Sequence, residues 1–308
     1  MTSVHRFRSW AHAIGTLLAL VSVSFIAILL WSQRHVLLDF HFGISGVLVL
    51  ALSSIAYAAA GLLLSAAWRL LLHWSGEHNV HPDESRRIYA RTQLAKYVPG
   101  NVAHLLGRHV VGRQAGWSHI GLLLSALFEL VSLLGVGTAI AILGLAVTGL
   151  QVGLLSFPWL LAVLAGLAGF GSVFLRIGPE LLVRRWPEIA IRVANCRIHE
   201  LWPMALFHAG YFLIGGLILL LVSLVVLGPA VDLASWPALL SLFAMAWMAG
   251  VITPGAPSGL GVRETVIVLG LASVAPAAQA SLVATLLRLV TVGGDLLFFL
   301  LAGGQRRG

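Results

Sequence analysis

Apolar runs dominate the chain, and several approach the ~20 residues that a helix needs to cross a bilayer. Of the 308 residues, 59% are hydrophobic and only 10% are charged, and the mean hydropathy is +0.97. Soluble domains carry roughly 25% charged residues. The sequence therefore predicts an all-α polytopic membrane protein in which residues 1–308 form a single integral membrane domain.

The apolar periods predict about eight transmembrane helices, two of which adjoin re-entrant or broken segments near 90–113 and 253–275. The first run resembles a secretory signal, but it lacks a small-residue cleavage site, so we expect a retained helix. The seventh is too short to span if it is straight. The expected crossings are 11–31, 44–72, 119–148, 152–175, 203–228, 236–252, 264–275 and 278–303.

Basic residues indicate the topology. If the N-terminus is cytoplasmic, nearly all lysines and arginines fall on the cytoplasmic side, and Arg34 stands almost alone on the other. We therefore expect a multi-pass protein with both termini in the cytoplasm. The net charge of +8 is explained by these short connections and by anionic lipid, so we expect no nucleic-acid partner.

Two connections are long enough to hold structure of their own. Residues 82–117 mix arginines with spaced apolar residues, as in an interfacial or partly re-entrant helical hairpin. Residues 177–202 have the pattern of a plain amphipathic surface helix. We assign the first a possible part in function and the second an anchoring role.

The first predicted helix break lies in the earlier connection. Pro99 disfavours helix at the preceding residue, and Gly100 permits a turn. A helix N-terminus beginning near Asn101 would then face an anionic ligand, unless the segment is only a surface loop between two amphipathic helices. The candidate binding residues here are Lys96, Tyr97, Pro99, Gly100, Asn101 and Arg108.

Three charged residues lie within apolar runs, where each is costly without a partner or a cavity. Glu129 either locks two helices together as half of an ion pair, or it serves as a titratable site or a headgroup contact. Arg288 and Asp295 share one face of the last helix, about 10 Å apart by helical rise, so each should pair with another helix. On charge alone we expect Arg288 to pair with Glu129.

The second predicted break is the stretch TPGAPSGLGVRE, residues 253–264. A helix interrupted by glycine and proline is the best sequence indicator of a substrate site in a membrane protein, although a simple tight loop is the alternative. Arginine offers a fork of donors that suits phosphate. The candidate residues here are Pro254, Gly255, Gly259, Gly261, Arg263 and Glu264.

No cofactor or metal site is expected. Cys196 is the only cysteine, and the histidines form no HExxH or similar motif. The stretch GLGVRE lacks the third glycine of a dinucleotide fingerprint. The two breaks lie at similar depths in the halves 1–150 and 151–308, which suggests a weak internal repeat.

The chain resembles the lysylphosphatidylglycerol synthase transmembrane region, also described as the flippase-like or UPF0104 membrane family. The resemblance depends on Glu129 and on the stretches LAKYVPGNVAHLLGR, PSGLGVRE and LLRLVTVGGD. It implies an eight-helix bundle in the bacterial cytoplasmic membrane that handles lipids or lipid-linked sugars. Leu130 follows Glu129 where family members often carry arginine, so an ion pair tied to that arginine is not implied.

The leading functional hypothesis is a translocase for lipids or lipid-linked sugars, whose partners are membrane lipids or lipid-linked glycans. Two alternatives stay open. One is an integral-membrane transferase, and the other is a non-transporting subunit that recruits a cytoplasmic glycosyltransferase or synthase. No catalytic motif is recognised, and the resemblance does not include the aminoacyl-transferase domain of true synthases, so we do not expect enzymatic activity.

Overall fold

The computed structural model describes residues 31, 43–98, 102–148, 202–253 and 256–304, and its regular secondary structure in these ranges is entirely helical. Five described helices are long and apolar enough to cross a membrane, which makes the chain a multi-pass membrane protein. They are α3 (Ile44–Trp74), α6 (His119–Thr148), α9 (Trp202–Leu227), α10 (Trp236–Ile252) and α12 (Ala277–Phe298). The all-α prediction is confirmed, and these five crossings lie where the sequence predicts them, with boundaries that differ by a few residues.

The remaining helices are short. They are α4 (Pro82–Gln93), η1 (Leu94–Tyr97), α5 (Ala103–Gln114), η4 (Gly228–Ala230), η5 (Leu233–Ser235), η6 (Pro257–Gly259), α11 (Val262–Leu271) and η7 (Phe299–Gly303). Helix α11 has 10 residues and rises about 15 Å, half of the ~30 Å hydrocarbon core. This matches the short seventh helix that the sequence predicts.

Three predictions concern residues outside the described ranges. The expected crossings 11–31 and 152–175 and the amphipathic segment 177–202 lie there almost completely. The total of eight crossings and the internal repeat therefore stay predictions.

The ends of α10 follow from its sequence. Asp232 and Ser235 form a reciprocal capping box just before the helix, and Pro237 occupies its first turn, where a missing N–H is tolerated. The helix stops at Ile252, and Thr253 is extended (ψ 114°). Pro254 follows in the sequence, and a residue before proline avoids the helical region.

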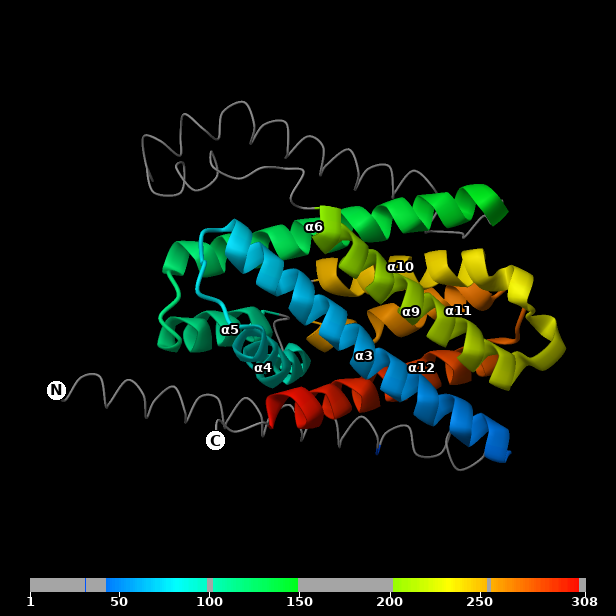
Figure 1. Cartoon of the computed structure of the whole chain (residues 1–308). Helices are drawn as coiled ribbons and strands as arrows, with labels where there is room; N and C mark the ends of the chain where they lie inside the picture. Colours follow the sequence, from blue (N-terminus) through cyan, green and yellow to red (C-terminus); the bar gives the residue numbers. More distant parts are fainter. Residues whose placement is uncertain (1–30, 32–42, 99–101, 149–201, 254–255, 305–308) are drawn as a thin grey trace.

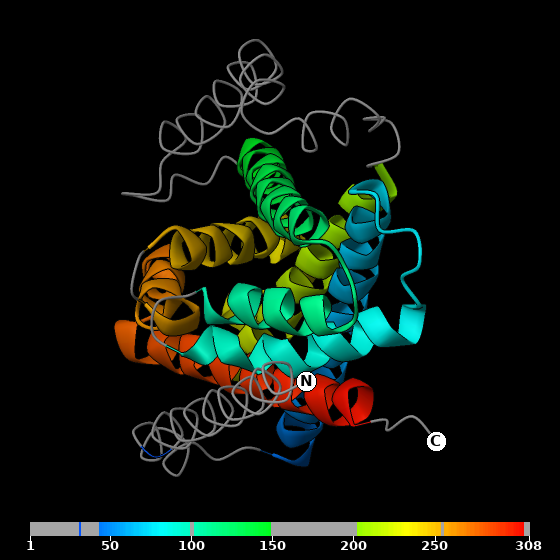
Figure 2. The same cartoon turned by 90° about the vertical axis from the view of Figure 1, so that its left-hand side faces the viewer.

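The long helices pack against one another, and the short helices α4 and α5 lie at one end of the bundle. Helix α3 packs against α9 and α12, while α10 packs against α6 and α9. Figure 1 shows these helices crossing the molecule lengthwise, with α4 and α5 gathered at one end. In Figure 2, α4 and α5 lie side by side between α6 and α12.

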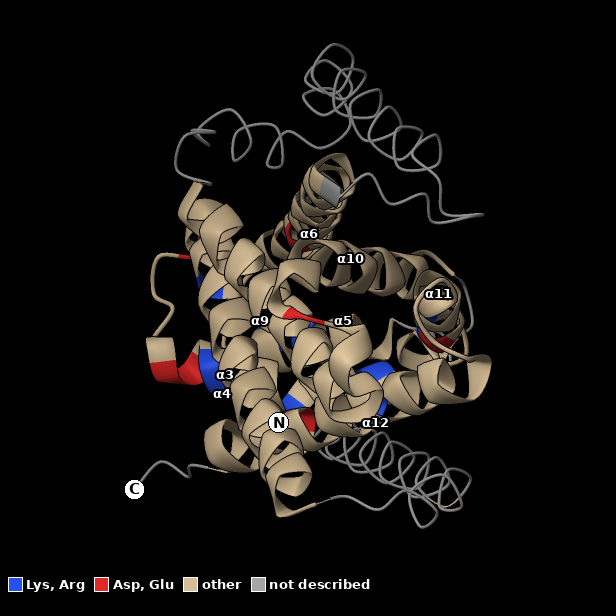
Figure 3. Cartoon of the chain, turned by 90° about the vertical axis from the view of Figure 1, so that its right-hand side faces the viewer, with Lys and Arg blue, Asp and Glu red and all other residues tan. Residues whose placement is uncertain are grey.

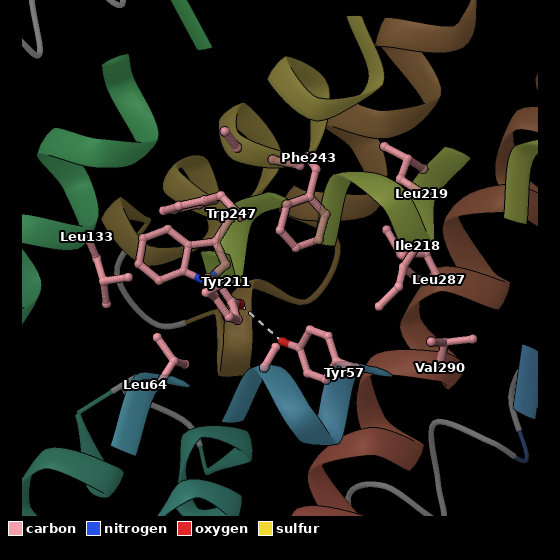
Figure 4. Packing of buried hydrophobic residues seen from close by; sticks show 14 of the residues in the cluster. Tyr57, Leu64, Leu133, Tyr211, Ile218, Leu219, Phe243, Trp247, Leu287 and Val290 are labelled. Carbon is pink, nitrogen blue, oxygen red and sulfur yellow. Dashed lines mark hydrogen bonds between the residues drawn. The ribbon is translucent and has the colours of Figure 1, made fainter. Parts of the chain in front are cut away.

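Aromatic side chains fill the centre of the bundle (Figure 4). Tyr57 of α3 and Tyr211 of α9 share a hydrogen bond of 3.1 Å between their hydroxyl groups. Phe212 and Trp247 pack edge to face 5.4 Å apart. On the outside, α3 exposes aliphatic residues such as Leu52, an arrangement suited to lipid contact. The interior and the outer surface of the described bundle are therefore both apolar, and polar side chains inside it need a specific explanation.

Candidate functional site

A cavity of about 340 Å³ lies inside the bundle, where α4, η1 and α5 meet α6, α9, α10 and the 256–263 segment. Its wall contains residues from both predicted breaks and from the long helices. They are Leu64, Tyr89, Gln93, Lys96, Val102, His104, Leu105, Arg108, Ala126, Glu129, Leu130, Leu133, Tyr211, Trp247, Val251, Ile252, Thr253, Ser258 and Arg263. Figure 3 shows the charged segments of α6, α11 and α12 on ribbons that are otherwise uncharged.

Arg108 and Glu129 form a buried ion pair on one wall of the cavity. Arg108 of α5 donates from Nη1 to Glu129 Oε2 of α6 at 2.5 Å. Tyr89 of α4 donates its hydroxyl to Glu129 Oε1 at 2.8 Å, and the guanidinium carbon lies 3.8 Å from the Tyr89 ring centroid. The pair therefore joins the hairpin helices α4 and α5 to α6.

Lys96 and Asp295 form a second ion pair. Lys96 Nζ lies 2.7 Å from Asp295 Oδ2, and Tyr97 donates its hydroxyl to the same oxygen at 2.6 Å. Both donors belong to η1, which forms where α4 ends, and Val98 is extended (ψ 137°), as the following proline predicts. Asp295 thus fastens η1 to α12.

Close backbone contact shapes the second break. Gly259 has a left-handed φ of +70°, and a Cβ built there would lie 2.6 Å from the Gly250 Cα of α10. Only glycine fits both conditions without strain. The break therefore folds tightly against α10.

Arg288 of α12 also contacts the second break. It donates to the backbone carbonyl oxygens of Ser258 (3.0 Å) and Pro257 (3.4 Å), and its Nε lies 3.6 Å from Glu264 Oε1. Ser258 itself has a φ of +50°, which is unusual for a residue with a Cβ. Arg288 therefore positions the broken segment and does not line the cavity.

Arg263 is different from the other cations of the site. It lies in the first turn of α11 and lines the cavity, with its guanidinium carbon 5.9 Å from the ring centroid of Trp247. Its Nε is buried without a hydrogen-bond acceptor, as are those of Arg108 and Arg288, but none of the described carboxylates forms an ion pair with Arg263. Among the described residues, its charge is therefore not balanced by a carboxylate.

The structure brings much of the predicted site together. Lys96, Arg108, Glu129 and Arg263 line one cavity. The other described residues of the prediction lie outside its wall. Asp295 contacts Lys96 and Tyr97, and Arg288 contacts Glu264 and the second break, to which Gly259 and Gly261 belong. The predicted residues that lie outside the described ranges are Pro99, Gly100, Asn101, Pro254 and Gly255.

One predicted pairing is wrong. Charge alone led us to expect Arg288 opposite Glu129, but Glu129 pairs with Arg108 and Arg288 pairs with Glu264. The short connection between α5 and α6 brings Arg108 beside Glu129, a contact that charge counting along the helices does not reveal. The expectation that Arg288 and Asp295 each pair with another element is confirmed.

Some lining residues escaped the sequence analysis. Tyr89 and Gln93 are one helical turn apart on α4, and Tyr211 and Trp247 lie within apolar runs where aromatic residues usually signal packing. His104 also lines the cavity. Burial, followed by the nearby charges of Arg108 and Lys96, holds the pKa of His104 well below its usual 6.5, so it is neutral at pH 7.

The fold and this geometry define a class: a multi-pass helical membrane protein with a charged cavity between two interrupted helical segments. Comparison of the chain with protein-family models and with curated proteins found no match. The resemblance to the flippase-like family therefore stays a prediction from its motifs.

Proposed function

We propose that the protein is a lipid translocase of the flippase-like kind, acting in the bacterial cytoplasmic membrane with both termini cytoplasmic. It binds the anionic headgroup of a phospholipid or lipid-linked sugar in the cavity, while the hydrocarbon chains stay outside the cavity. The observation that carries this proposal is Arg263, which lines a cavity bounded by both broken segments and forms no ion pair with a described carboxylate. Arginine matches phosphate oxygens through paired hydrogen bonds.

The ion pairs explain how such a site can exist inside an apolar bundle. A charge within the membrane is costly unless it is paired or faces water. Lys96 and Arg108 are paired with carboxylates, so they can shape the wall without binding a ligand themselves. A headgroup then needs to displace water only from Arg263 and from neutral polar groups such as Tyr211.

Translocation by the reconstituted protein tests the proposal. Liposomes containing the protein should equilibrate fluorescent phospholipid, or a polyprenyl-linked sugar, between leaflets faster than protein-free liposomes. Equal rates in the two preparations, for every headgroup tried, would overturn the function. Co-purification of a glycosyltransferase with an inactive but folded protein would instead favour the recruiting alternative.

Arg263→Gln tests the site itself. We expect at least a tenfold loss of lipid movement, because a charge-assisted phosphate contact contributes about 1.5–3 kcal/mol. The unfolding temperature should change little, since no described ion pair depends on Arg263. Arg86→Gln is the matched control, because Arg86 pairs with Asp83 at the exposed start of α4. Equal translocation rates for the two variants would contradict the assignment of Arg263.

A further inference from the structure

Of the four described lysines and arginines at this site, three form ion pairs with carboxylates and one does not. Lys96 is matched by Asp295 at 2.7 Å, Arg108 by Glu129 at 2.5 Å, and Arg288 by Glu264 at 3.6 Å. Arg263 has no carboxylate partner among the described residues. His104 adds no charge at neutral pH. The described surroundings of the cavity therefore carry a net charge of about one positive unit.

An apolar groove adjoins this cavity. It has a volume of about 300 Å³, lies between α5 and α6, and shares with the cavity Val102, Leu105, Arg108, Ala126 and Leu130. Beyond the shared wall its lining is mainly aliphatic and includes Leu106 and Leu123, which are 62% and 57% exposed. A molecule in both spaces would meet a charged wall at one end and hydrocarbon at the other.

We propose that the ligand is a lipid whose phosphodiester headgroup carries one net negative charge, with the phosphate at Arg263 and one acyl chain in the α5–α6 groove. This inference rests on the proposed function and narrows it to one substrate class. The single charge of such a headgroup neutralises the described surroundings of the cavity. A diphosphate carries at least one further negative charge, which would be buried without a partner.

The groove selects a lipid over a free phosphate compound. Apolar surface gains from leaving water roughly in proportion to the area buried, and a soluble phosphodiester has no chain to place between α5 and α6. Charge and apolar surface thus specify different parts of the same ligand. Each part can be tested separately.

Binding to the purified protein in detergent micelles tests the charge selection. The probes share two oleoyl chains and differ only in the headgroup: phosphatidylglycerol, phosphatidylcholine and diacylglycerol pyrophosphate, with glycerophosphoglycerol as the chainless form. We expect phosphatidylglycerol to bind at least tenfold more tightly than each of the others, which corresponds to about 1.4 kcal/mol. Equal or tighter binding of the pyrophosphate lipid would overturn the inference, as would chainless ligand binding equally well.

A charge variant of the protein tests the same charge selection with the lipid probes unchanged. Asp295→Asn keeps an acceptor for Lys96 and Tyr97 but removes one negative charge beside the cavity, so the preference should shift at least tenfold toward the pyrophosphate lipid. Asp232→Asn is the matched control, because Asp232 is exposed in the connection between α9 and α10. Glu129→Gln also removes one negative charge, beside Arg108. This variant is used in place of Asp295→Asn if Asp295→Asn fails to fold.

The outcomes separate the two proposals. If no lipid probe binds, the proposed function fails. If lipids bind but the preference for phosphatidylglycerol is absent, or neither charge variant changes it, the function stands and the charge selection fails.

Discussion

Replacing Glu129 by leucine should lower the free energy of unfolding by about 3–5 kcal/mol, because the Arg108 guanidinium would stay buried without a counter-charge. The pair is deeply enclosed, with 6% and 4% of the two side chains exposed. Arg108→Met should be less damaging, since a carboxyl group can take up a proton whereas a guanidinium cannot lose one. Thermal unfolding of the purified variants in detergent measures both effects.

The double variant separates structure from function. Arg108→Met with Glu129→Leu removes both charges and should recover most of the stability, as replacing a buried pair by apolar residues commonly does. If lipid movement recovers too, the pair serves only to hold α5 against α6. If stability returns and translocation does not, the pair also contacts the headgroup. A double variant no more stable than Glu129→Leu would contradict the assigned pairing.

Gly259→Ala should displace the second break and reduce lipid movement by at least tenfold. A left-handed residue with a Cβ costs roughly 1–2 kcal/mol. Here the new methyl group would also lie 2.6 Å from the Cα of Gly250, a backbone atom that cannot turn aside. The displaced segment carries Arg263, whose Nε lies 2.7 Å from the same Cβ position. Translocation rate and unfolding temperature measure the result.

Gly261→Ala is the matched control for this substitution. Gly261 also has a positive φ, of +79°, but nothing lies within 4 Å of a Cβ placed there. It should show the backbone strain alone, a loss of about 1–2 kcal/mol in stability with little effect on the position of Arg263. Equal losses of translocation in both variants would contradict a role for the contact between Gly250 and Gly259.

The helical framework was predictable because it depends on local properties. Apolar run length gave the positions of α3, α6, α9, α10 and α12, since a helix in lipid must satisfy its backbone internally. Proline and glycine marked both breaks for equally local reasons. The pairing of Glu129 was not predictable, because the carboxylate fits any nearby cation and only packing selects Arg108.

Which cation is free was also beyond the reach of the sequence. Lys96, Arg108, Arg263 and Arg288 are alike as candidates for phosphate in the sequence, and three of them prove to be paired with carboxylates. An ion pair depends on distances of a few ångströms between residues far apart in the chain. Lys96 and Asp295, for example, lie far apart in the sequence.

The sequence by itself determined that this is a helical membrane protein with two interrupted segments and buried charge, because hydrophobicity, proline and glycine act over one or two helical turns. Only the tertiary structure decided that the two segments border one cavity, that three ion pairs form around it among the described residues, and that Arg263 has no carboxylate partner among them. Those properties arise from how helices pack, and packing joins residues that the chain keeps far apart.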